Sequence, residues 1–426
     1  MSSTPEGSRG RANLPSTSDS EILVVGGGIG GLATALACAR SGREVRVVER
    51  ASKFSEVGAG LQLAPNGAEA LRILGVLDTL DEMAVFPAQM AMHDINSGTA
   101  LSRIDLGSNL SKRFGHRYRV MHRSDLLDAL LSAVRALPNV VLETGQHVTQ
   151  ARIEADGSTV TCANGNSFHG RVLIAADGVN SVLRRQIHGP DSVRCEGYVA
   201  YRGTVPFAEL PEHSGEDTVV LYTGDGNHLV QYPVRRGELY NQVAVFRSSQ
   251  YRPDLDDASW ATPDELDAAF AKTVPYVRAS ISRIDRQFRW PLRDRDPIRN
   301  WVRDSAALMG DAAHPMYQYL AQGACQALED AVTLGACLGV EVSGKALARY
   351  ARLRQTRTAQ VQLTARKFGE FIHLGGMAAS LRDTILQSHD PADYSQMEWL
   401  WGWRGSLDGA DPDAGICTEE LMEETR

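Results

Sequence analysis

Hydrophobic positions near the start of the chain form two short strand-like runs with a helical segment between them. Residues 22–25 are apolar without polar alternation, which is typical of a parallel strand buried on both faces. The alanine-rich segment from Leu32 predicts a helix that lies close to the sheet, and Gly42 follows as its C-cap. A second apolar run ends at Glu49. The pattern over residues 21–50 therefore predicts a βαβ unit.

Later hydrophobic patterns alternate between strands and helices. Apolar residues recur at helical spacing after Ser124, which predicts a helix with that serine as its N-cap. Residues 172–176 form another buried-strand run. Short runs bounded by turn residues predict a hairpin and four further antiparallel strands: residues 89–95, 99–105, 198–207, 218–222, 228–234 and 240–246. Beyond Gly344, long helical stretches continue to about residue 387.

These patterns predict an α/β fold of several units. We expect a polar, disordered tail over residues 1–20. We also expect a Rossmann-like domain that is interrupted by a second domain, and a C-terminal helical region after both. The expected ranges are 21–85, 117–190 and 296–345 for the Rossmann-like domain, 86–116 and 191–295 for a sheet-rich second domain, and 346–426 for a C-terminal helical region.

Composition narrows the classes of function. The chain has 426 residues, which exceeds one average hydrophobic core, and a formal net charge of −8, which disfavours nucleic-acid and anionic-membrane partners. No apolar run has the length of a membrane span, and the N-terminus lacks the pattern of a signal peptide, so we expect a cytoplasmic protein. The six cysteines have neither disulfide-framework nor metal-site spacing, so we expect no bound metal.

The loop between the first strand and helix carries the strongest chemical signal. Gly26, Gly28 and Gly31 have G-x-G-x-x-G spacing, which gives a tight turn, backbone approach to a pyrophosphate and close packing of helix on strand. Glu49 ends the second strand near the position where a carboxylate accepts hydrogen bonds from an adenosine ribose. The unit therefore predicts a dinucleotide site.

Three further motifs place charged groups at strand ends. His122-Arg123-Ser124 puts a cation beside a helix N-terminus, which suits phosphate or ribose oxygens. Asp177-Gly178 follows a buried strand, and Gly310-Asp311 does the same with a helix ahead. Each motif alone is more typical of a plain turn or helix cap; the series of motifs carries the signal.

In this order the motifs resemble those of the flavoprotein aromatic hydroxylases, single-component FAD monooxygenases that include salicylate and hydroxybenzoate hydroxylases. The resemblance covers about residues 21–340. It implies an FAD-binding domain of the glutathione-reductase/hydroxybenzoate-hydroxylase type with a β-sheet-rich substrate domain. It further implies non-covalent FAD, NADH or NADPH as a transient co-substrate, O2, a small aromatic acid and a homodimer.

The resemblance also assigns cofactor positions. Glu49 would bind the adenosine ribose, Arg123 and Asp177 the pyrophosphate region, and Asp311 the ribityl chain. The helix that starts near Gly323 would direct its positive end at the flavin's pyrimidine edge. The full expected set is Gly26, Gly28, Gly31, Glu49, Arg50, Arg123, Asp177, Asp311, Gly323 and Ala324.

Two segments resemble the 3-hydroxybenzoate 6-hydroxylases in particular: His228-Leu-Val-Gln-Tyr232-Pro and His314-Pro-Met-Tyr-Gln318. Most salicylate-type relatives have a proline in place of Gln318. Independently, strand alternation puts His228 and Tyr232 on one face, and Gln318 follows the flavin-associated Asp311 closely. We therefore expect His228, Tyr232 and Gln318 to be catalytic, with either His228 or Gln318 accepting a phenol proton. The alternative without a catalytic role is that His228 and Tyr232 are ordinary core residues and that His314 is structural.

The leading hypothesis is an FAD-dependent monooxygenase that hydroxylates 3-hydroxybenzoate to 2,5-dihydroxybenzoate (gentisate) through a flavin hydroperoxide. Three alternatives stay open at this stage. The first is the same chemistry on salicylate or 6-hydroxynicotinate. The others are a flavin dehydrogenase or oxidase without oxygen insertion, and a non-catalytic nucleotide-binding sensor.

Overall fold

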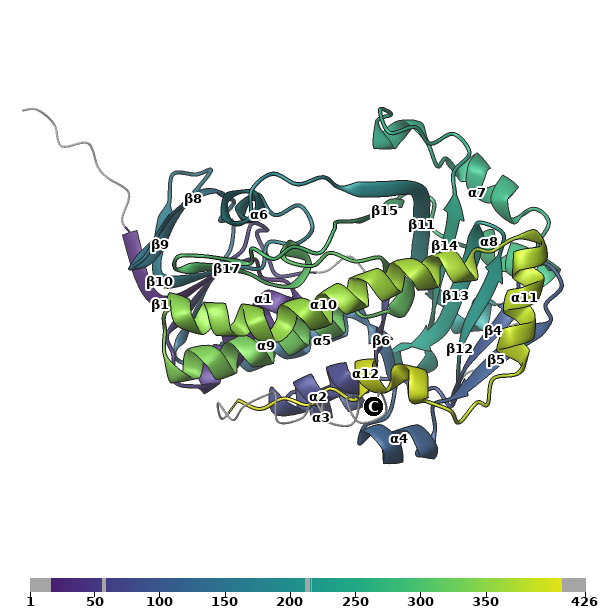
Figure 1. Ribbon diagram of the computed structural model, residues 1–426, viewed down its shortest axis with the longest axis horizontal. Coiled ribbons are helices and arrows are strands. Elements are labelled where there is room, and N and C mark those ends of the chain that lie inside the picture. The colour runs from purple at the N-terminus through teal and green to yellow at the C-terminus, as the bar shows by residue number, and fades with distance from the viewer. Residues whose placement is uncertain (1–16, 56–58, 211–214, 216, 408–426) are drawn as a thin grey trace, which may run out of the picture.

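A β-sheet whose central strands are parallel forms the first half of the molecule (Figure 1). The structure is a computed structural model that describes residues 17–55, 59–210, 215 and 217–407. The strand order is β16-β17-β10-β1-β2-β7, with β9 paired to β10 and β8 to β9. Their bounds are β1 (Thr17–Val25), β2 (Val45–Val48), β7 (Val140–Glu143), β8 (Val148–Glu154), β9 (Gly157–Cys162), β10 (Ser167–Ala175), β16 (Val302–Arg303) and β17 (Ala306–Leu308).

Helices cover this sheet, and the small residues predicted from the sequence let them approach closely. Helix α1 (Ile29–Arg40) packs against α9 (Gly323–Val340), where a Cβ on Gly335 would lie only 2.6 Å from the Cβ of Ala37. The other helices of this half are α2 (Pro65–Ile73), α3 (Leu77–Asp81), α5 (Arg123–Arg135) and α6 (Val182–Ile187). The predicted α/β class with a Rossmann-like unit is confirmed.

A second sheet of strands in the order β15-β11-β14-β13-β12-β4-β5 forms the other half. Its strands are β4 (Gln89–Asp94), β5 (Ala100–Asp105), β11 (Arg194–Pro206), β12 (Thr218–Gly224), β13 (Asn227–Val234), β14 (Leu239–Arg247) and β15 (Trp290–Asp294). Apolar residues of α7 (Pro263–Phe270) and α8 (Pro275–Ile281) share a core with this sheet. The four predicted antiparallel strands, β11–β14, pair antiparallel and β4 and β5 form the predicted hairpin, while β4 joins β12 in parallel.

The C-terminal helices connect the two halves. In Figure 1, α10 (Gly344–Ile372) runs beside α9 and extends toward the second sheet, and α11 (Gly376–Gln387) lies against β5. At the end of α12 (Glu398–Trp401), the ring of Trp401 lies 5.8 Å from that of Phe114 in α4 (Ser108–Phe114) and 5.9 Å from that of Tyr118. A small sheet of β3 (Gly60–Leu63) and β6 (Arg119–His122) lies at the junction of the halves.

Two local expectations need correction. The tail expected over residues 1–20 is wrong for residues 17–20, because β1 begins at Thr17 and Thr17–Ser20 pair with Ser167–Gly170. Residues 1–16 and 408–426, included in the expected tail and helical region, lie outside the described residues. The N-cap of α5 is His122 rather than Ser124: its imidazole accepts a hydrogen bond from the Ser124 N–H, so the helix starts at Arg123. The division into domains stays a prediction.

Candidate active site

The glycine loop after β1 requires glycine for steric reasons. Gly26 has a φ of +109°, and a Cβ there would lie 2.2 Å from the carbonyl oxygen of Ala176. A Cβ on Gly31 would lie 1.9 Å from the carbonyl oxygen of Gly26. The chain thus brings the loop, the start of α1 and the end of β10 closer together than any side chain would allow, as a dinucleotide cradle requires.

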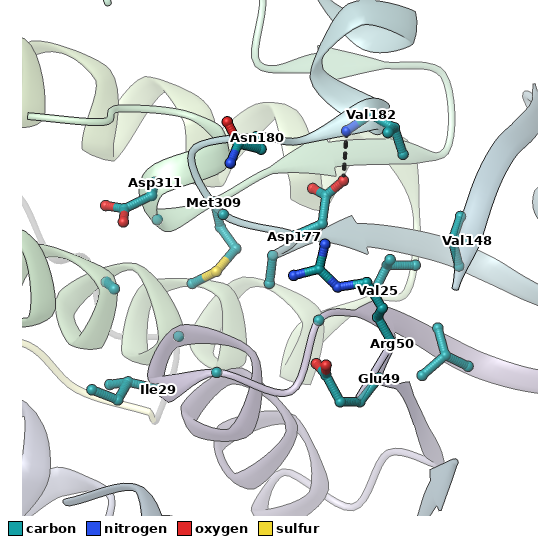
Figure 2. A pocket seen from close by; sticks show the side chains of 18 of the residues that line it. Val25, Ile29, Glu49, Arg50, Val148, Asp177, Asn180, Val182, Met309 and Asp311 are labelled. Carbon is teal, nitrogen blue, oxygen red and sulfur yellow. Dashed lines mark hydrogen bonds between the residues drawn. The ribbon is translucent and has the colours of Figure 1, made fainter. Parts of the chain in front are cut away.

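Glu49 is fixed beside this loop. Its Oε2 accepts a hydrogen bond from the Gly27 N–H at 2.7 Å, and its Oε1 accepts one from the Ala51 N–H at 2.8 Å. Each carboxylate oxygen keeps a further lone pair, so Glu49 can accept hydrogen bonds from ribose hydroxyls without moving. Figure 2 shows its side chain beside that of Arg50 on the same wall.

A cavity of about 380 Å³ opens above the loop and unites the predicted cofactor residues. All of the ten expected positions except Gly31 line it, and Gly31 acts instead by allowing helix and strand to touch. The walls come from β1, β2, β8, the residues that follow β10, η4 (Gly310–Ala312) and the starts of α1, α5, α6 and α9. Four separate sequence motifs therefore meet at one site.

Asp177 contributes an unpaired acceptor to this cavity. Its Oδ2 accepts a hydrogen bond from the backbone N–H of Val182 at 3.0 Å (Figure 2). It also accepts one from the backbone N–H of Leu183 at 3.3 Å. Its Oδ1 is buried without a hydrogen-bond partner among the described residues, and burial raises the pKa of the carboxyl group. A hydroxyl group of a bound dinucleotide would satisfy that oxygen, so the cavity fits such a cofactor.

Positive charge enters the cavity from two helix starts. Arg123 is the first residue of α5 and lines the cavity. Its guanidinium can donate charged hydrogen bonds to the oxygens of a pyrophosphate. Gly323 and Ala324 open the 18-residue helix α9, whose N-cap Gln322 makes no side-chain capping bond. Its first N–H groups and its dipole therefore favour negative charge at the end of the cavity beside Asp311.

The predicted catalytic strand is β13, and both of its polar candidates are buried. His228 is 2% exposed and Tyr232 is 3% exposed. They share one face of the strand but lie about 13 Å apart along it, four residues at 3.3 Å each. The two residues therefore stand near opposite ends of β13.

Tyr232 lies near a hydrogen bond in the first half of the molecule. The Tyr118 hydroxyl donates to Gln62 Oε1 at 2.8 Å. Burial raises the pKa of Tyr232 and outweighs the opposite effects of Arg202 and Gln62, so the phenol keeps its proton at neutral pH. A protonated phenol can donate a hydrogen bond to a ligand.

His228 faces a second histidine that sequence reasoning missed. Its Nδ1 lies 2.8 Å from Nε2 of His373, which follows α10. Burial, with His373 nearby, holds the pKa of His228 well below 6.5, so its imidazole is neutral at pH 7. Gln318 is half-buried and starts η5 (Gln318–Leu320), and the ring of the next residue, Tyr319, lies 5.7 Å from that of His228. The segment of Gln318 thus approaches β13 at the His228 end.

Comparison with known proteins identifies this architecture. A family model described as FAD binding domain matches residues 19–364. The 3-hydroxybenzoate 6-hydroxylase of Polaromonas naphthalenivorans strain CJ2 is 40% identical over 390 residues, which is 90% of this chain and 96% of that protein. The chain belongs to the FAD-dependent aromatic hydroxylases. This chain also shares 38% identity over 390 residues with the 3-hydroxybenzoate 6-hydroxylase of Klebsiella oxytoca, and the match covers 90% of this chain and 96% of that protein.

A solved structure supports the same assignment of fold and cofactor. The crystal structure of Klebsiella pneumoniae HpxO complexed with FAD and uric acid is 28% identical to this hydroxylase, with a TM-score of 0.78. The match covers 91% of this chain and 96% of that chain. Within the part of the hydroxylase that the structure describes, no helix combines the length and apolar character needed to cross a membrane.

A buried ionic network holds one wall of the cavity of the hydroxylase in place. Asp330 on α9 accepts hydrogen bonds from the Gly310 N–H at 3.0 Å and from Arg354 Nε at 2.7 Å, and lies 2.6 Å from His314 Nε2. All these side chains are at most 1% exposed. The network fixes the loop that carries Asp311, so His314 has a structural role. The motif around Asp311 could be recognised from the sequence, but Arg354 could not, because its partners lie on another helix.

Proposed function

We propose that this hydroxylase converts 3-hydroxybenzoate to 2,5-dihydroxybenzoate (gentisate), with FAD as bound cofactor and NADH or NADPH and O2 as co-substrates. The observation that carries the proposal is the 40% identity, over 90% of the chain, to a 3-hydroxybenzoate 6-hydroxylase. The polar pair on β13 supports it, because His228 and Tyr232 offer a proton acceptor and a hydrogen-bond donor, and a phenolic acid can use both.

Each polar residue has a distinct task in this proposal. Bound FAD supplies hydride acceptance from the nicotinamide and oxygen activation. A phenolate is a far better nucleophile than a phenol, so the site must remove the phenol proton. His228, kept neutral by burial, is available to accept that proton, and Gln318 approaches from the adjoining turn. Tyr232, kept protonated, donates a hydrogen bond that holds the substrate.

The nicotinamide co-substrate has a different mode of binding in this proposal. The chain has one glycine-rich βαβ unit, at residues 21–50, and its cavity is assigned to FAD. NAD(P)H therefore binds transiently at an open surface, reduces the flavin and leaves. A homodimer is part of the same proposal.

The test is NADH and NADPH oxidation by the purified, FAD-loaded protein across a panel of ring substrates. The panel contains 3-hydroxybenzoate, salicylate and 6-hydroxynicotinate, and products are identified by mass spectrometry under labelled O2. We expect oxidation to be stimulated most by 3-hydroxybenzoate, with one labelled oxygen atom in gentisate. If only salicylate or 6-hydroxynicotinate gave a product, the proposed substrate would be wrong. If no product formed, or if the product carried no labelled oxygen, the proposed reaction would be wrong.

A further inference from the structure

The corner between α10 and α11 docks on the turn that leads into the catalytic strand. The Thr223 hydroxyl on β12 donates to the carbonyl of Ile372, and the Gly226 N–H donates to the carbonyl of His373 at 3.3 Å. A Cβ on Gly375 would lie 2.4 Å from the Asp225 carboxylate, so the contact is close. In Figure 1 this corner joins the long α10 to the second sheet. The C-terminal helices thus contribute directly to the surroundings of His228.

A buried arginine holds this corner in place. Arg382 on α11 is 2% exposed, and its Nη1 donates to the carbonyl of Ile372 at 3.0 Å and to that of Leu374 at 3.4 Å. Its Nε donates to Asp383 at 2.8 Å. These bonds satisfy the carbonyl groups that the end of α10 leaves without helical partners. The backbone on both sides of His373 is therefore fixed.

The His373 ring is also fixed by packing. It stacks on Tyr198 with 4.6 Å between ring centroids and 12° between planes, and meets Tyr319 edge-on at 5.5 Å. Gly369 makes room for Tyr319, because a Cβ there would lie 2.3 Å from that ring. The imidazole is 7% exposed. The packing therefore holds His373 Nε2 at 2.8 Å from His228 Nδ1.

The electrostatics of the pair exclude a stored positive charge. Burial, with the Arg382 guanidinium, lowers the pKa of His373 to about 4, and burial also lowers that of His228. The titratable and charged groups around the pair are Tyr198, Tyr319, Arg382, Asp383 and Asp225, and Arg382 is paired with Asp383. Both imidazoles are therefore neutral at pH 7, and a proton that reaches one nitrogen of His228 must leave from the other.

We propose that His373 is the positioning residue for His228: its Nε2 accepts the Nδ1 proton of His228 and so leaves Nε2 of His228 free to take the substrate's phenol proton. This inference rests on the proposed function. Within the described residues, His228 Nε2 makes no hydrogen bond. One proton passes from the phenol oxygen to His228 Nε2, the Nδ1 proton passes to His373 Nε2, and His373 releases its Nδ1 proton to water. The phenolate keeps the electron pair.

The same arrangement explains why a low-pKa histidine serves as the acceptor. A buried imidazole cannot hold a second proton for long, but it can pass one through its ring when a partner accepts the other. An orienting group that fixes the tautomer of a catalytic histidine is a general device in proton transfer. Here that group comes from the C-terminal helices.

Two variants separate hydrogen bonding from packing. His373→Phe keeps a ring to stack on Tyr198 but has no acceptor. His373→Gln places an amide oxygen near the former Nε2 and restores the acceptor. His93→Phe is the matched control, because His93 lies on β4 of the same sheet outside the site. All variants are compared at equal FAD content.

The first readout is the ionisation of bound 3-hydroxybenzoate, followed by ultraviolet difference spectra against pH in the FAD-loaded enzyme without NAD(P)H. We expect the apparent ionisation pH to rise by about one unit in His373→Phe, a tenfold change in equilibrium. His373→Gln and His93→Phe should stay near the parent. The second readout is product formed per NADH oxidised, which should fall about 10²-fold in His373→Phe, the lower end for a lost proton acceptor.

Two outcomes would overturn the inference. One is parental ionisation and coupling in His373→Phe; the other is an equal loss in His373→Gln and His373→Phe, which would mean that only packing matters. The parent enzyme tests the proposed function separately. If it hydroxylates another phenol of the panel instead, the substrate is wrong and the titration uses that phenol; if it hydroxylates none, both proposals fail.

Discussion

The side chain of Asn241 on β14 accepts a hydrogen bond from the backbone N–H of Gly60 on β3, with 2.6 Å between Oδ1 and N. This bond joins the second sheet to the small sheet of β3 and β6, beside the proposed substrate-binding phenol. A Cβ on Gly60 would lie 2.6 Å from both Asn241 Cγ and Tyr232 Cε2. The position of Tyr232 thus depends on glycine in a different sheet.

Gly60→Ala should therefore weaken substrate binding and stability together. The added methyl group must displace Tyr232 or Asn241, and overpacking of this kind costs about 1–3 kcal/mol of the free energy of unfolding. We expect a lower Tm and a higher KM for the aromatic acid, with FAD still bound. Gly203→Ala is the control, since its nearest neighbour would be 3.7 Å away. Equal KM values for Gly60→Ala and the parent would refute the proposed role of Tyr232.

Glu49→Ala should weaken FAD binding far more than it slows chemistry. Loss of hydrogen bonds to a charged acceptor costs about 1.5–3 kcal/mol, or roughly 10- to 150-fold in Kd. The measurement is fluorescence titration of deflavinated protein with FAD, and Glu49→Gln should lie between Ala and the parent. Glu44→Ala, exposed in the same βαβ unit, serves as control. Full flavin content with lost hydroxylation in Glu49→Ala would contradict the assigned role.

His228→Ala and Gln318→Ala should uncouple NADH oxidation from hydroxylation. Flavin reduction needs only hydride transfer from the nicotinamide, whereas oxygen transfer needs an activated phenol. Loss of a positioned proton acceptor costs about 10²- to 10⁴-fold. We expect NADH consumption to continue with 3-hydroxybenzoate while hydrogen peroxide replaces product, as measured by peroxide assay and chromatography. Parental coupling in both variants would make these residues ordinary core residues.

Asp330 should produce an acid-dependent loss of stability. Burial alone would raise its pKa, but His314 and Arg354 bring it down to about 2. A carboxylate with a depressed folded-state pKa stabilises the protein above its unfolded pKa, about 3.9, and that stabilisation is lost as pH falls toward the folded value. We therefore expect Tm to decrease between about pH 4 and pH 2.

Arg354→Met tests the same network at neutral pH. Removing one partner of a buried ion pair costs about 3–5 kcal/mol, because the remaining charges are uncompensated. Tm should fall steeply at pH 7, whereas Arg352→Met, on the exposed face of α10, should have little effect. Equal Tm values for the two variants would show that the network contributes nothing.

Local steric and periodic rules explain what the sequence could predict. Gly31 is required by a contact with Gly26 inside one βαβ unit, Gly26 has a positive φ that favours glycine, and strand alternation put His228 and Tyr232 on one face. The cofactor set also followed from motifs, because parallel strands carry their ends to one sheet edge and nine of those positions meet in one cavity. The roles of the individual residues remain predictions.

The sequence by itself determined the nucleotide-binding unit and the polar strand, because each is encoded by spacing within a few tens of residues. The class of chemistry came from the resemblance of a series of motifs over residues 21–340 to a known family. Only the tertiary structure decided which groups surround the catalytic candidates. His373 meets His228 across 145 residues of chain, and Asn241 meets Gly60 across 181. β12 takes a parallel partner in β4, although its own pattern carries no sign of direction. Such contacts depend on how helices and sheets pack, and side-chain periodicity fixes the face of an element but not the element that covers it.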